Sequence, residues 1–174
     1  SIPESLSTLA LSTQTPILCS ERSSLEIMWR LRPYLWRVLA PTDSMHGVLL
    51  DVLGMGVMIT GESGVGKSEL ALELVSRGHG LVAEDVVELN RIAPETFEGH
   101  CPEILRDFLE VRGLGMLNIR IIFGETAVRR RKNLNLIVHL KKTSSSDFNA
   151  LERLPIENVN ENIMGLSIRK VIIH

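Results

Sequence analysis

The sequence has few of the features that mark secreted, metal-clustered or membrane proteins. Only two of its 174 residues are cysteines, and Cys19 and Cys101 lie far apart, with no Cys-x-x-Cys pair and no Cys/His cluster at metal-binding spacing. No apolar run approaches the roughly 20 residues that span a bilayer, and no basic stretch followed by an apolar one opens the chain. These absences favour two reduced thiols in a cytoplasmic protein with no membrane segment.

The charge pattern gives no indication of a nucleic-acid partner. The formal net charge is −2, and the one basic run, Arg129-Arg130-Arg131-Lys132, carries no interleaved aromatic residue. Such a run fits either a solvated face or a surface that attracts an acidic or phosphorylated partner. Hydrophobic residues make up 44% of the chain, which is the ordinary share for one globular domain with an appendage.

A break at Ala40-Pro41-Thr42-Asp43 divides the chain into two parts. Residues 1–23 lack clear periodicity, whereas residues 25–39 carry an apolar stripe typical of a helix, which Pro33 should kink. Trp29 and Trp36 share a face of this helix, and packing is a better explanation for them than ligand stacking. We therefore expect residues 1–41 to be the end of an N-terminal domain with a linker helix, and residues 42–174 to form the main domain.

One octet constrains the function more than any other stretch. It has the pattern G-x-x-x-x-G-K-S of a phosphate-binding loop, whose backbone N–H groups point at an anion. An apolar strand over residues 56–60 precedes it and a helix over residues 68–77 follows it, which is the expected context. The nucleotide-binding residues are therefore predicted to be Gly61, Glu62, Ser63, Gly64, Val65, Gly66, Lys67 and Ser68.

The remaining pattern indicates an α/β domain with a sheet-rich core. A hairpin is predicted around Leu53-Gly54, a strand over residues 81–85 that continues through 86–89, and a helix over residues 103–110. Buried strands are expected over residues 134–140 and 168–173.

Several charged residues near the loop are candidates for chemistry, and their position alone leaves their roles open. Asp85 closes an apolar strand after the loop helix, where it can be a magnesium ligand or a general base. Strand alternation points Glu84 the other way, toward a solvated rim or a supporting role behind the metal. Glu110 and Arg112 flank Val111 and can share a face, as a metal ligand and a phosphoryl-neutralising cation. The local pattern around His46 favours a structural role.

Four stretches together resemble one family, the bacterial HPr kinase/phosphorylases. They are residues 45–52 (MHGVLLDV), 61–74 (GESGVGKSELALEL), 77–85 (RGHGLVAED) and 109–115 (LEVRGLG), and the last is similar to the signature of that family. Members phosphorylate a regulatory serine on HPr, a phosphocarrier protein, and remove that phosphate by phosphorolysis. The resemblance implies a phosphoenolpyruvate carboxykinase-like P-loop fold, ATP and Mg²⁺ as cofactors, phosphate and pyrophosphate as co-substrates, and a homohexamer.

The resemblance also implies roles for single residues. Lys67 matches a phosphate-contacting catalytic lysine, and Ser68 and Glu110 match the magnesium ligands. Asp85 matches the carboxylate that takes the serine proton during phosphorylation and returns one during phosphorolysis. His46 is similar to an active-site histidine of the family, although its local sequence pattern favours a structural role.

A further active-site arginine is implied at Arg153, and residues 111–118 are implied to matter for both directions. The family usually has two aspartates where this chain has Glu84-Asp85. We also expect C-terminal helices of the family to be missing after His174. The alternatives are a P-loop kinase for a small molecule and a nucleotide-dependent regulator that binds HPr without turnover.

Overall fold

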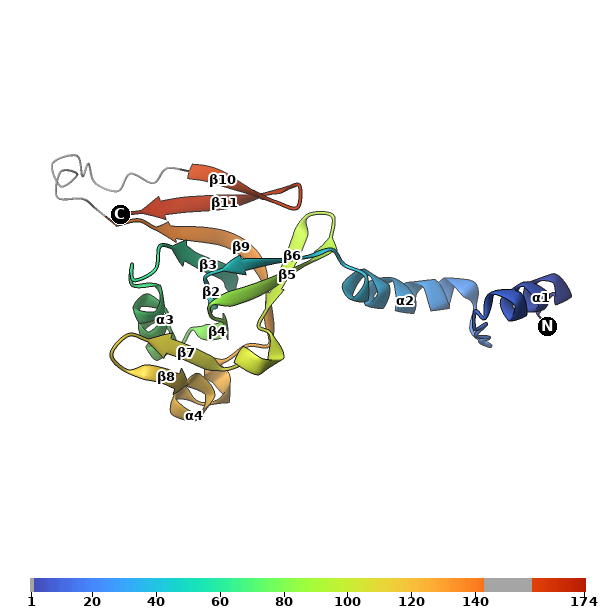
Figure 1. The fold of residues 1–174 in the computed structure, drawn as a ribbon, viewed down its shortest axis with the longest axis horizontal. Coiled ribbons are helices and arrows are strands. Elements are labelled where there is room, and N and C mark those ends of the chain that lie inside the picture. Colours follow the sequence, from blue (N-terminus) through green and yellow to red (C-terminus); the bar gives the residue numbers. More distant parts are fainter. Residues whose placement is uncertain (1, 143–157) are drawn as a thin grey trace. The chain divides into compact units, whose positions relative to one another are not determined.

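The computed structural model describes residues 2–142 and 158–174, which divide into two units at Val38/Leu39 (Figure 1). The first unit contains α1 (Glu4–Thr13) and α2 (Ser24–Val38). The Ser23 hydroxyl accepts the Glu26 N–H at the start of α2, as an N-cap does. Helix α1 lies where no periodicity indicated one, and neither helix buries a residue.

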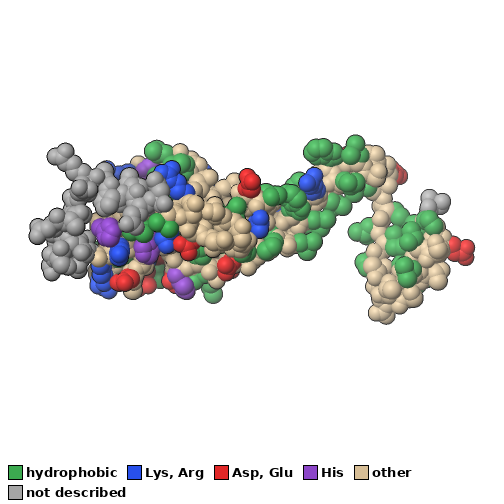
Figure 2. All heavy atoms as spheres, turned by 90° about the horizontal axis from the view of Figure 1, so that it is seen from above, with side chains coloured by type: hydrophobic (Ala, Val, Ile, Leu, Met, Phe, Trp, Pro, Cys, Tyr) green, Lys and Arg blue, Asp and Glu red, His purple; other side chains and the backbone are tan. Residues whose placement is uncertain are grey.

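The apolar side chains of α2 are exposed in this unit, as the hydrophobic atoms along it show in Figure 2. Trp29 and Trp36 are 71% and 43% exposed, and the Arg32 guanidinium lies 4.8 Å from the centre of the Trp36 ring. Pro33 lies inside the helix, as the sequence places it.

The second unit is a mixed α/β fold built on one large sheet. Among the described residues this sheet has nine strands, in the order β1-β5-β6-β9-β3-β2-β4, with β11 and then β10 added at β9 (Figure 1). The strands are β1 (Thr42–His46), β2 (Val48–Val52), β3 (Met55–Gly61), β4 (Gly80–Ala83), β5 (Val86–Ala93), β6 (Thr96–His100), β9 (Arg131–Leu140), β10 (Asn158–Ile163) and β11 (Leu166–Ile173). Strand β9 runs parallel to β3 and β11, and the other pairs are antiparallel.

The remaining elements of this unit are short. A separate two-stranded sheet consists of β7 (Phe108–Val111) and β8 (Gly115–Asn118). The helices are α3 (Lys67–Ser76), α4 (Ile119–Phe123) and the 3₁₀ turns η1 (Glu103–Leu105) and η2 (Glu125–Ala127).

The central strands are buried on both faces because their alternate side chains enter two different cores. Val48 and Leu50 of β2 pack with α3 and β7, whereas Leu49 between them packs with β5 and β6. A Cβ placed on Gly99 of β6 would lie 2.4 Å from Leu49 Cδ2, so a larger residue there would force the buried Leu49 side chain to shift. Phe97 is the largest fully buried side chain of the core that contains Leu49.

The predicted hairpin is confirmed. Strands β2 and β3 pair from Val48↔Ile59 to Val52↔Met55, and Leu53 and Gly54 both have positive φ, as a tight two-residue turn requires. Two other expectations are wrong. The strand is interrupted after β4, because the chain bends at Glu84 and Asp85 before β5 resumes in the same antiparallel register against β1. Residues 103–110 form η1 and β7 instead of a helix.

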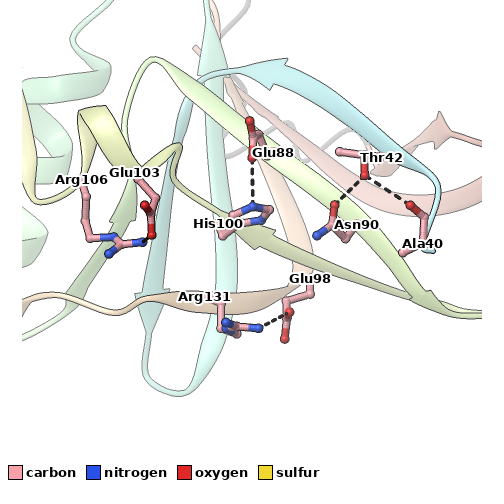
Figure 3. A network of polar contacts seen from close by, with 9 residues as sticks. All are labelled: Ala40, Thr42, Glu88, Asn90, Glu98, His100, Glu103, Arg106 and Arg131. Atoms are coloured by element: carbon pink, nitrogen blue, oxygen red, sulfur yellow. Dashed lines mark hydrogen bonds and ion pairs between the residues drawn. The ribbon is translucent and has the colours of Figure 1, made fainter. Parts of the chain in front are cut away.

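Polar cross-strand pairs hold the sheet where β5, β6 and β9 meet (Figure 3). His100 Nε2 lies 2.9 Å from a Glu88 carboxylate oxygen, and an Arg131 Nη1–H donates to Glu98 over 3.1 Å. Lys132 Nζ lies 3.0 Å from Asp51 on β2. Three residues of the basic run, Arg129, Arg131 and Lys132, are therefore engaged in ion pairs, which argues against a free basic patch.

The packing makes a stability prediction. Phe97→Ala should lower the free energy of unfolding by about 3–5 kcal/mol, because a fully buried ring is removed and a cavity remains. Chemical denaturation of this variant and of Ile104→Ala, whose side chain is 88% exposed, measures the difference. The control should change by less than about 0.5 kcal/mol. A loss below about 1 kcal/mol for Phe97→Ala would contradict the packing described here.

Candidate active site

The phosphate-binding loop joins β3 to α3 and is held by close packing beneath it. At Gly61 φ is +141°, and a Cβ there would lie 2.4 Å from the Leu140 carbonyl oxygen of β9. Ala71 and Val75 anchor α3 in the core, as its apolar face predicted. The loop is therefore fixed at both ends, with the N-terminus of α3 directed to the space above it.

Lys67 folds back over its own loop. Its Nζ donates to the carbonyl oxygens of Gly61 and Glu62, each over 2.9 Å. These bonds hold one positive charge at the centre of the loop, where an anion bound to the backbone N–H groups would contact it.

A cavity of about 740 Å³ opens above the loop. Its walls come from four parts of the second unit: the loop with the start of α3, the β1–β2 connection, the β4–β5 turn, and η1 with β7 and β8. The charged and imidazole side chains among the lining residues are His46, Lys67, Glu69, Glu84, Asp85, Glu110 and Arg112.

Asp85 lies in the cavity in a left-handed conformation, with φ of 63°. Aspartate tolerates this region better than most residues, because its short polar side chain can bond locally. The Gly47 N–H donates to the Asp85 carbonyl oxygen over 3.1 Å. This hydrogen bond ties the β4–β5 turn to the β1–β2 connection. The Asp85 side chain is 77% exposed and lines the cavity.

His46 accompanies Asp85. Its Nδ1 lies 3.2 Å from the Asp85 carbonyl oxygen and 3.6 Å from Oδ1 of the carboxylate. Strand pairing explains the contact, because β1 and β5 are antiparallel and His46 is opposite Val86. The local sequence pattern favoured a structural role for His46, but the structure places its side chain beside the Asp85 carboxylate at the cavity.

Glu84 also lines the cavity, where alternation predicted that it would point away. The bend of the chain at these two residues places both carboxylates at the cavity. Ser68 Oγ–H donates to Glu84 Oε1 over 2.7 Å, and the Glu110 N–H donates to Oε2. Burial raises the pKa of Glu84, and the nearby charges of Glu110 and Asp85 raise it further, against the two hydrogen bonds that lower it.

Glu110 and Arg112 share a face, as their spacing around the buried Val111 predicted. A Cβ built on Gly64 would lie 3.2 Å from Arg112 Nη2, so the guanidinium lies directly beside the phosphate-binding loop. Apolar side chains complete the wall. Met116 belongs to the segment 111–118 that the resemblance singled out, whereas Leu105 and Phe108 were missed because they had no motif to signal them.

The donor set has the chemistry that magnesium prefers. Ser68, Glu84 and Glu110 offer oxygen atoms around one part of the cavity. Within residues 2–142 and 158–174, no group of three or more His, Cys, Asp or Glu side chains is close enough to hold a metal alone. Magnesium commonly completes its shell with water and substrate phosphates, so the residues fit a metal that enters with a nucleotide.

Comparison with known proteins assigns the family. The model of the HPr Serine kinase C-terminal domain matches residues 37–174. The chain belongs to this family. It is 70% identical over 172 residues to the HPr kinase/phosphorylase of Nitrosomonas europaea, covering 99% of this chain and 53% of that protein. It is 55% identical over 171 residues to that of Bordetella pertussis, covering 98% and 55%.

A solved structure agrees. The HPr(Ser) kinase/phosphatase from Coxiella burnetii matches with a TM-score of 0.68 and 32% identity, covering 75% of this chain and 85% of that one. The chain spans about half the length of the curated relatives it matches.

Two further expectations from the sequence concern an active-site arginine and membrane segments. Arg153 lies outside the described residues. Over the part of the chain that the structure describes, no helix is long and apolar enough to cross a membrane.

A histidine at the base of the loop gives a pH prediction. His139 Nδ1 lies 3.0 Å from Oγ1 of Thr60, its cross-strand neighbour directly before Gly61. Burial lowers the pKa of His139 below the usual 6.5, and the Lys170 charge lowers it further. Since the unfolded chain then binds the proton more readily, native stability should decrease as pH falls below about 6.5.

His139→Gln should remove this contribution while keeping an acceptor for Thr60. Urea unfolding at about pH 7.5 and pH 5 would show it, because the wild type should lose more stability than the variant on acidification. An equal loss in both proteins would contradict the assignment.

Proposed function

We propose that the chain forms the catalytic part of a bifunctional enzyme that phosphorylates a regulatory serine of HPr with ATP and removes that phosphate by phosphorolysis. One observation carries the proposal: the phosphate-binding loop with Lys67 and the Asp85–His46 pair face one cavity. The names of the relatives support the substrate. A phosphoenolpyruvate carboxykinase-like P-loop fold is part of the proposal, because a strand, a glycine-rich loop and a helix frame the site.

In the forward direction, the loop N–H groups and Lys67 bind the β- and γ-phosphates of ATP. Ser68 and Glu110 would hold Mg²⁺, which offsets negative charge on the transferring phosphoryl group when bound. Asp85 accepts the proton of the serine hydroxyl as its oxygen attacks the γ-phosphorus and the bond to ADP breaks. His46 lies where it can orient the Asp85 carboxylate.

In the reverse direction, an oxygen of inorganic phosphate attacks the phosphorus of phosphoserine. The bond to the serine oxygen breaks, Asp85 returns a proton to that oxygen, and pyrophosphate leaves with the transferred group. The same loop serves both directions, because phosphate and pyrophosphate occupy positions that nucleotide phosphates take otherwise.

The proposal extends to features that the geometry does not reach. Arg153 would add a cation to the site, and residues 1–41 would end an N-terminal domain joined to the catalytic domain at 42–174. A homohexamer would bring copies together, and a cytoplasmic location would supply ATP.

The activity has a direct test. Incubation with ATP, Mg²⁺ and HPr should add one phosphoryl group to a serine, read by mass spectrometry. With labelled phosphoserine-HPr and inorganic phosphate, the label should appear in pyrophosphate. Label found only in free phosphate would mean hydrolysis, and nucleotide binding without any transfer would favour a regulator.

Substitution of Asp85 tests its proposed role in proton transfer. Asp85→Asn should lower the rate of transfer in both directions by about 10²–10⁴-fold, because proton transfer is lost. Nucleotide binding, measured by calorimetry, should persist, because Asp85 is not part of the loop. Asp43→Asn on β1 is the control and should retain activity, since Asp43 bonds locally to the Ser44 N–H. Near-normal transfer by Asp85→Asn would remove Asp85 from the mechanism.

A further inference from the structure

Glu84 joins two elements that lie far apart in the sequence. Its Oε1 accepts the hydroxyl hydrogen of Ser68, sixteen positions before it, and its Oε2 accepts the backbone N–H of Glu110, twenty-six positions after it. Ser68 lies in the first turn of α3, and Glu110 lies in β7. We call these two hydrogen bonds the Glu84 bridge.

The backbone that carries this carboxylate is itself held in place. The Glu84 carbonyl oxygen accepts the Val86 N–H over 2.8 Å, and the Gly47 N–H donates to the carbonyl oxygen of the next residue, Asp85, over 3.1 Å. Both partners also belong to anchored elements, since α3 and β7 pack in the same core. The bridge therefore connects rigid elements, and its length depends on the Glu84 side chain.

We propose that Glu84 is a positioning residue whose bridge sets the spacing of Ser68 and Glu110 as ligands of one divalent cation. The inference rests on the proposed function, which makes those two residues the metal ligands. By accepting the Ser68 hydroxyl hydrogen, Glu84 leaves the lone pairs of Oγ available for a cation. By accepting the Glu110 N–H, Glu84 fixes the backbone of β7 at Glu110 and therefore the point from which the Glu110 side chain extends.

This spacing matters because magnesium requires near-octahedral geometry and short bonds. Partners behind metal ligands commonly change metal affinity by about 10–100-fold when they are removed. An aspartate at this position would be shorter by one methylene, about 1.5 Å, and would not reach both partners from the same backbone. The length of a glutamate side chain is thus matched to the gap between Ser68 and the Glu110 N–H in this chain.

Metal affinity is the first measurement. Mn²⁺ would be titrated by electron paramagnetic resonance in the presence of ADP, with the wild type, Glu84→Ala, Glu84→Asp and the control Glu73→Ala. Glu73 lies on α3, the helix that also carries Ser68. It pairs with Arg77 and is not part of the cavity wall. Both Glu84 variants should bind Mn²⁺ about 10–100-fold more weakly, and the control should be unchanged.

Amide exchange at Glu110 is the second measurement, and it needs no metal, nucleotide or HPr. In both Glu84 variants the Glu110 N–H should exchange at least about 10-fold faster, because its acceptor is lost or out of reach. The Ala71 amide within α3 is the internal control. If Glu84→Ala does not fold, Glu84→Gln replaces it; glutamine keeps the reach and an acceptor oxygen, so it should retain slow exchange where Glu84→Asp does not.

Two results would overturn the proposal. One is Mn²⁺ affinity and Glu110 exchange within twofold of wild type in the Glu84 variants. The other is weakened Mn²⁺ binding with unchanged Glu110 exchange, which would make Glu84 a direct ligand. A protein that shows the expected Glu84 dependence but transfers nothing to HPr would contradict the proposed function and still support the positioning role.

Discussion

The bend of the chain at Glu84 and Asp85 determines which groups meet above the phosphate-binding loop. Strand β4 pairs with β2 on one side of the sheet, whereas β5 pairs with β1 and β6 on the other. Two residues make the bend, and the positive φ of Asp85 allows it at a modest cost, because aspartate tolerates this region better than most residues. The Gly47 N–H and the Glu84 hydrogen bonds offset that cost by fixing the turn between the β1–β2 connection, α3 and β7.

The features that were predictable from the sequence are the local ones. The hairpin at Leu53-Gly54, the phosphate-binding loop and the apolar face of α3 each depend on neighbours within a few residues, so the pattern contains them. The helix expected over residues 103–110 failed for the opposite reason. Residues 108–111 are a strand because β8 pairs with them and because Leu109 and Val111 enter the core beneath α3, which no local pattern records.

His46 and Glu84 show the same limit in the site. A lone histidine before a strand has no local signal, and its position beside Asp85 follows only from the antiparallel pairing of β1 with β5. Alternation sends Glu84 away from the cavity only if the strand continues, and it does not. The family resemblance pointed to His46, but it gave no account of Glu84, since it implied an aspartate at that position.

The charges of the cavity give a physical reason for requiring a cation. Among its described lining residues are four carboxylates, at Glu69, Glu84, Asp85 and Glu110, and two cationic side chains, Lys67 and Arg112. Nucleotide phosphates alone would enter a site with excess negative charge, even with the helix N-terminus and the loop N–H groups in their favour. A divalent cation that enters with the nucleotide reverses this balance. Under the proposed function, the carboxylates that would repel a bare phosphate chain then serve as ligands and supports of the complex.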